Sequence, residues 1–159
     1  MRRLLATLAI LLVLALCGWW VWPFFLPASK QVARQQALIL ERAGKHDWKN
    51  LAVMVAADYH DAAGMNKQLA LNTAKEILDP FISVELVWIE SSVEIKDKQA
   101  TVIGTLRMKA TGPAGGSMIT DRVNQVKEPW KFIWRHDGWN PEDWKLISIA
   151  NSEVENISP

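Results

Sequence analysis

The residues best suited to acid–base chemistry lie together around Tyr59, the only tyrosine in the chain. A buried phenol beside a protonated carboxyl can polarise a carbonyl group while a second carboxylate moves a proton. Asp58 and Asp61 flank Tyr59, but on the helix predicted here neighbouring positions diverge by about 100° and cannot all enter one pocket. A structural tyrosine beside solvated acids is therefore the favoured interpretation. We assign no catalytic residue, and keep Tyr59 and Asp58 as candidates for lining a ligand pocket.

The metal-binding residue types are too scattered to form a motif. The histidines show neither H-x-x-x-H nor H-E-x-x-H spacing, and they are His46, His60 and His136. The single cysteine, Cys17, has no intramolecular partner for a disulfide. The sequence thus predicts no metal site and no cofactor, and the net charge of +1 lacks the basic excess that nucleic-acid binding requires.

A glycine-rich segment around residues 112–116 could suggest a phosphate-binding loop. No Gly-Lys-Ser/Thr follows it, and no helix is expected to begin there, so a flexible loop between two strands is predicted.

Tryptophan is concentrated in the second half of the chain, at positions 88, 130, 134, 139 and 144. Packing inside the sheet is the default role for such large rings. The alternative is a pocket for an apolar ligand, for which Trp88 and Trp134 are the candidates. Trp139 lies between Gly138 and Asn140-Pro141 in a predicted turn, where an exposed indole would suit a partner surface or contact with a membrane.

The N-terminus carries an uncharged apolar run over residues 4–26, preceded by Arg2 and Arg3. About 20 helical residues cross a hydrocarbon core, so an uncleaved signal-anchor is favoured. Two alternatives remain open, a cleaved signal peptide and a lipoprotein acylated at Cys17. Positive charge is retained on the cytoplasmic side. The sequence therefore predicts a single-pass protein of a bacterial-type inner membrane, with residues 1–27 as anchor and residues 28–159 as a periplasmic domain.

Helical signals fill the first half of that domain. Apolar spacing predicts a helix over residues 29–43, ended by Gly44. Asp47 is placed to cap a second helix whose apolar stripe continues through Tyr59 towards Gly64, and Asn66 is placed to cap a third that ends near Leu78. The order of helices before strands indicates an α+β domain.

Strand signals follow. Residues alternate from Ile82 to Trp88, a polar turn at residues 96–99 predicts a hairpin, and the chain returns to Met108. Residues 118–135 are predicted as a long segment with an edge, bend or bulge at Pro129, and a turn at residues 136–141 leads into a last strand.

Several strings resemble the nuclear transport factor 2-like superfamily, whose fold is also called cystatin-like. They include Asp47-Trp48-Lys49-Asn50-Leu51, Gly64-Met65-Asn66-Lys67, residues 93–102, and residues 130–135 closing on Trp144-Lys145-Leu146-Ile147. The resemblance covers nearly the whole domain and implies three helices packed on a curved, mainly antiparallel sheet around a pocket. The same fold hosts isomerases, dehydratases, transport adaptors and secretion-assembly subunits, so it does not name the function.

The sequence interpretation is a membrane-anchored, non-catalytic module that binds a small apolar ligand or an envelope protein, with a homodimer left open. The alternatives are an assembly subunit similar to those of type IV secretion, and an enzyme of steroid-isomerase or dehydratase type.

Overall fold

The computed structural model describes residues 26–112 and 116–155 of the 159-residue chain. The predicted membrane span over residues 4–26 therefore lies, except for Leu26, outside the described residues. Within them, no helix is both long enough and apolar enough to cross a bilayer.

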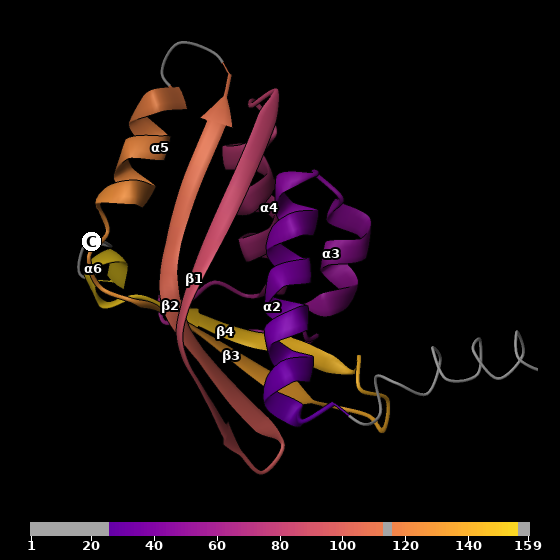
Figure 1. Cartoon of the computed structure of the whole chain (residues 1–159). Helices are drawn as coiled ribbons and strands as arrows, with labels where there is room; N and C mark the ends of the chain where they lie inside the picture. Colours follow the sequence, from indigo (N-terminus) through magenta and orange to yellow (C-terminus); the bar gives the residue numbers. More distant parts are fainter. Residues whose placement is uncertain (1–25, 113–115, 156–159) are drawn as a thin grey trace, which may run out of the picture.

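The domain is α+β, with the helices of its first half packed on one face of a single antiparallel sheet and a later helix along the open part of β2 (Figure 1). The helices are α2 (Ala28–Gly44), α3 (Trp48–Met54), α4 (Lys67–Leu78), α5 (Gly116–Gln125) and the short α6 (Ser152–Glu155). The strands follow sequence order in the sheet and are β1 (Ser83–Lys96), β2 (Gln99–Thr111), β3 (Trp130–His136) and β4 (Trp144–Ala150). The predicted fold class is confirmed for the domain.

The sheet is curved because its strands differ in length and carry irregularities. β1 and β2 form a long hairpin, and β3 pairs with β2 only from Gln99 to Gly104. Pairing shifts register between Glu90 and Ser92 in β1, and again between Ile133 and Trp134 in β3. Such bulges add twist and bend a strand, which lets the sheet wrap around α2.

The core lies between α2 and the inner face of the sheet. Val32 and Gln36 of α2 and Trp134 of β3 are all 0% exposed. The Trp134 indole donates to Gln36 Oε1 at 3.0 Å, so this completely buried ring has its polar atom satisfied. The predicted apolar stripe of α2 is confirmed, since Val32, Ile39 and Leu40 are buried.

The second helix is shorter than predicted. The Asp47 cap is confirmed, because its side chain accepts from the Asn50 backbone N–H, but α3 ends at Met54 rather than near Gly64. Val55 adopts an extended conformation and makes a parallel bridge to Leu146 of β4. The backbone after Met54 thus pairs with the free edge of β4 instead of continuing the predicted helix.

The region after β2 also differs from the prediction. The segment expected as a loop and irregular strand contains α5, which begins at Gly116, so the expectation that no helix begins there was wrong. α5 lies along β2 where β3 no longer pairs with it (Figure 1). Pro129 instead directly precedes β3.

Asn124 of α5 occupies the hydrogen-bonding position that a neighbouring strand would fill. Its Oδ1 accepts from the Met108 N–H at 2.9 Å, and its Nδ2 donates to the Met108 carbonyl at 2.9 Å. One side-chain amide therefore satisfies both backbone groups of Met108 on an otherwise open edge.

We predict that Asn124→Asp destabilises the domain. The carboxylate keeps the acceptor but loses the donor, and it faces the Met108 carbonyl, so the free energy of unfolding should fall by about 1–3 kcal/mol in urea denaturation. Gln125→Glu makes the same amide-to-acid change at an exposed neighbour and should cost less than about 0.5 kcal/mol. Equal losses in the two variants would contradict this role for Asn124.

Candidate functional site

A surface cavity lies where the tip of the β1–β2 hairpin meets the end of β3. Its volume is about 590 Å³, and we call it the hairpin cavity, defined by Lys96, Asp97, Lys98, Gln99, Arg135, His136 and Asp137. Asp97 has a φ of 53°, a left-handed conformation that Asp tolerates in tight turns. The His136 N–H donates to the Lys98 carbonyl at 2.8 Å, which fixes the hairpin tip against β3.

Arg135 organises the charges at this site. It makes a two-pronged contact with Asp58, with N–O distances of 2.8 and 2.9 Å, and its Nε contacts Asp137 Oδ1 at 2.5 Å. The hydrogen bonds from Arg135 lower the pKa of Asp58, and those same bonds raise the pKa of Arg135. Asp58 is therefore held as a carboxylate and is poorly suited to accept a proton at neutral pH.

Tyr59 pairs with Asp61, and Asp58 points elsewhere. Tyr59 and Asp61 are buried, and the phenol donates to Asp61 Oδ2 at 3.1 Å. Asp61 Oδ1 accepts in turn from the Met65 backbone N–H at 2.8 Å. Burial is the main cause that raises the pKa of Tyr59, and the adjacent Asp61 charge raises it further. The phenolic proton is thus already directed to a protein carboxylate.

The two tryptophans predicted as pocket candidates are both packed on the inner side of the sheet. Trp134 is completely buried, whereas Trp88 is partly buried and meets Phe132 edge-on with 5.1 Å between ring centroids. Gly104 lies opposite, and a Cβ there would come within 2.6 Å of the Trp88 ring. Their role as ligand contacts stays a prediction.

Three buried N–H donors on this inner side have no acceptor among the described residues: Gln36 Nε2, Trp88 Nε1 and Trp130 Nε1. Buried donors normally have partners. They are the polar groups that a ligand inside the sheet would meet.

The four candidates predicted to line a pocket are therefore distributed over separate environments. Asp58 lies on the surface with Arg135, Tyr59 is buried with Asp61, and the two tryptophans lie under α2 and beside Phe132. Trp139 is 82% exposed in the β3–β4 turn. In the described part of the chain, no three His, Cys, Asp or Glu side chains come close enough to hold a metal ion.

The sequence did not indicate that Arg135, Lys96 and Lys98 form one site. Residues 96–99 were predicted as a polar turn, but the partner of Asp58 lies 77 residues further along the chain. No local spacing connects the two, and only the packing of the 55–60 segment along β4, the neighbour of β3 in the sheet, brings them together.

Neither the protein-family models nor the curated proteins include a match to this chain. Solved structures do match, among them a conserved protein from Planctomyces limnophilus, with a TM-score of 0.57, 19% identity, and coverage of 76% of this chain and 91% of that one. A nuclear transport factor 2-like protein from Cytophaga hutchinsonii has a TM-score of 0.52 and 13% identity over 74% of this chain and 91% of its own. The domain has the nuclear transport factor 2-like fold.

A further match is to part of a longer chain. Bd1075 from Bdellovibrio bacteriovorus has a TM-score of 0.58 and 8% identity, but the match spans 76% of this chain and only 38% of Bd1075. At these identities the likeness establishes the fold alone.

We predict that Tyr59 ionises only at strongly alkaline pH. Because its folded pKa is raised, its contribution to stability is complete below the unfolded value of about 10 and is lost as pH rises towards the folded value. Since Tyr59 is the sole tyrosine, phenolate absorbance during an alkaline titration reports this group directly. It should appear together with unfolding, and a phenolate formed at about pH 10 in the folded domain would contradict the pairing.

The same pair predicts the cost of removing the hydroxyl. Tyr59→Phe strands a buried carboxylate oxygen, so the free energy of unfolding should fall by about 1–3 kcal/mol. Asp58→Asn changes an exposed acid nearby and should leave the phenol titration unchanged.

Proposed function

We propose that the chain is a membrane-anchored binding module of a bacterial-type envelope, with its nuclear transport factor 2-like domain on the periplasmic side. The anchor is supported by the uncharged apolar run over residues 4–26 behind Arg2 and Arg3. The binding role is supported above all by the hairpin cavity, which is open to solvent and held in shape by Arg135.

The walls of the hairpin cavity favour a polar occupant. They present the lysines of the hairpin tip and the Asp97 carboxylate beside the Arg135–Asp137 ion pair. Apolar ligands instead bind in concave pockets lined mainly by hydrophobic side chains. A protein segment carrying both charge signs matches this surface best. A partner protein is therefore favoured over the small apolar ligand, for which the inner-face donors near Trp88 remain the alternative location.

Catalysis is the weaker alternative. Two neighbours with this fold are described as candidate dehydratases, one from Streptomyces avermitilis and one from Novosphingobium aromaticivorans. The groups that would perform acid–base chemistry here are already engaged, Tyr59 with Asp61 and Asp58 with Arg135. This favours binding. A role in secretion assembly is a special case of protein binding, and the hairpin cavity would be its contact surface as well.

The anchor is tested on the full chain. Carbonate-resistant, intact protein in the membrane fraction is expected, because an uncleaved span of about 20 apolar residues does not leave the bilayer. Mature protein beginning near Ser29 in the soluble periplasm would instead indicate a cleaved signal. An acylated N-terminal Cys17 would indicate a lipoprotein.

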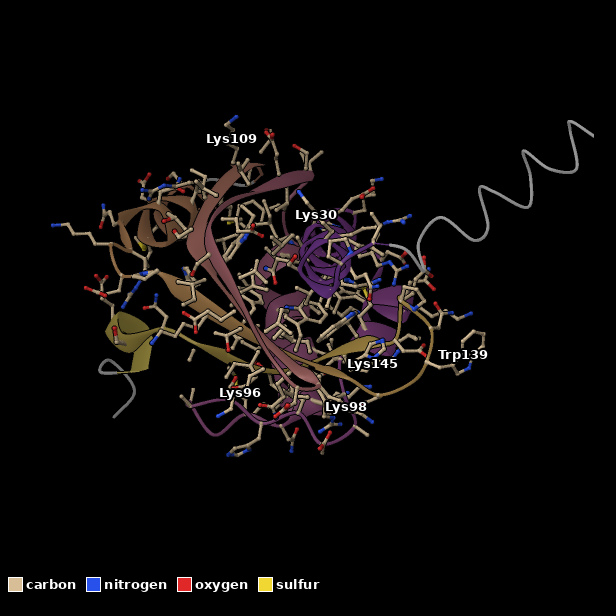
Figure 2. The ribbon with its side chains drawn as sticks, turned by 60° about the horizontal axis from the view of Figure 1, so that its bottom comes forward. Lys30, Lys96, Lys98, Lys109, Trp139 and Lys145 are labelled. Atoms are coloured by element: carbon tan, nitrogen blue, oxygen red, sulfur yellow. The ribbon has the colours of Figure 1, made fainter. Side chains whose placement is uncertain are left out.

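The binding face is tested by photocrosslinking from a residue introduced at Lys98, with Lys109 as the matched position. Lys96 and Lys98 lie together at one end of the molecule, and Lys109 lies far from them (Figure 2). A discrete adduct is expected from position 98 only. Lys96→Glu should weaken its yield at least about tenfold, corresponding to about 1.4 kcal/mol. Identical adducts from both positions, or none from position 98, would exclude the hairpin cavity as the binding face.

A further inference from the structure

The β3–β4 turn holds a large exposed ring on a rigid support. Trp139 is 82% exposed. On either side of it the Asp137 N–H donates to the Asp143 carbonyl at 3.0 Å, and the Asp143 N–H donates to the Asn140 carbonyl at 2.9 Å. The His136 ring also contacts the Asn140 carbonyl at 2.9 Å. Because these bonds fix the turn, the indole is presented to the outside of the molecule (Figure 2).

This turn lies beside the first turn of α2 (Figure 1). Trp144, which begins β4 just after the turn, donates from its indole to Gln31 Oε1 at 3.2 Å. Gln31 Nε2 in turn donates to the Leu26 carbonyl at 2.8 Å. A short series of contacts therefore connects the turn carrying Trp139 to the end of the apolar run.

The connection between that run and the domain is very short. α2 begins at Ala28, and the Pro27 carbonyl already accepts from the N–H groups of Lys30 and Gln31. Two residues, from Leu26 to Ala28, extend over at most about 7 Å. If residues 4–26 span the bilayer, the surface around the start of α2 has no room to move away from the lipid.

We propose that the β3–β4 turn docks on the bilayer, with the Trp139 indole seated in the interfacial layer. Indoles favour this layer because the ring is apolar while its N–H stays hydrated. Two lysines accompany it: Lys30 on α2 is exposed, and Lys145 on β4 is half-buried, with its Nζ donating to the Val53 carbonyl at 3.0 Å. Their positive charges suit the anionic headgroups of the membrane surface. The docking surface consists of Trp139, Lys30 and Lys145, and it fixes how the domain is oriented on the membrane.

This inference rests on the proposed anchor, and the anchor is also what favours lipid over a protein partner. A tether of two residues keeps the bilayer within reach of this surface at all times, while a protein partner has to displace the lipid. The turn also carries no second exposed large hydrophobic residue that would extend a protein-binding patch.

The test uses the full chain in vesicles of phosphatidylethanolamine and phosphatidylglycerol. An environment-sensitive fluorophore is attached at Glu142→Cys, an exposed position in the same turn, in a Cys17→Ser background. Lipids brominated high in the acyl chain should quench it roughly twofold, because the turn sits at the depth of the interface. Trp139→Ser should remove most of this quenching, and Trp139→Tyr should keep a substantial part of it.

Ile82→Ser serves as the matched control. Ile82 is 84% exposed, and its N–H donates to the Thr111 carbonyl. It lies two residues before Val84, whose backbone is close to Gly44 at the C-terminal end of α2. Ile82 is therefore far from the β3–β4 turn, which lies at the other end of that helix. This variant should leave quenching unchanged.

The outcomes separate this inference from the anchor. Chain that stays carbonate-resistant but shows no quenching at position 142 overturns the docking surface while the anchor stands. Chain that does not remain with the vesicles overturns both. A photocrosslinker placed at position 139 in cells gives a further outcome. A discrete protein adduct from it, together with no lipid quenching in vesicles, makes the turn a protein-docking site and also overturns the inference.

Discussion

The hydrogen bond between the Trp134 indole and Gln36 is the interaction on which the rest of the domain depends. Both residues are completely buried, so each polar group would be unsatisfied without the other. β3 pairs with β2 without a register shift, so the alternation of the strand turns Trp134 to the same face as Phe132, and Gln36 bonds the ring to α2. Val32 and Val102 then close the space on either side. The curved sheet and α2 are thus joined at the centre of the core by one specific pair.

A second constraint is that the sheet has open edges, and two of them, along β4 and along part of β2, are covered in different ways. β4 is covered by the segment after α3, where the Ala56 and His60 N–H groups donate to the Leu146 and Ile147 carbonyls. The part of β2 that β3 does not reach is covered by α5 through Asn124. Unpaired strand edges invite association with other chains, so covering them keeps the domain folded on itself.

These two edges also explain where sequence reasoning stopped. The boundaries of α2 and α4 and the β1–β2 hairpin were predicted because their periodicity and their caps, such as Asn66, are local signals. The end of α3 was not predicted. Val55 and Tyr59 continue a helical stripe, but the backbone at Val55, Ala56 and His60 pairs with a strand about 90 residues later. In α5 the residues Ile119 and Val123 suit a strand as well as a helix, and only the open edge of β2 decides between them.

The candidate site was less predictable than the fold for the same reason. Tyr59 could be singled out from the sequence as the only phenol. Its partner Asp61 could not, because the two side chains meet only where the helix ends at Met54 and the chain becomes irregular. On a helix these side chains would diverge, whereas in the irregular segment they meet. The pairing of Asp58 with Arg135 likewise depends on tertiary structure. Chemical residue types can be read from the sequence, but their combination depends on which backbone segments compete for the same strand edge.

The hairpin cavity and the Trp139 turn are neighbours, and this restricts what the cavity can bind. Asp137 lines the cavity and lies two residues before Trp139, and Lys145 pairs with Arg135 across β3 and β4. A turn docked on the bilayer would therefore hold the cavity close to the membrane surface. Its occupant would then have to present its polar segment near the headgroups, as a protein embedded in the same membrane does. The rigid link between α2 and the sheet through Gln31 and Trp144 would keep that geometry constant, so the short tether would select the partner by position as well as by charge.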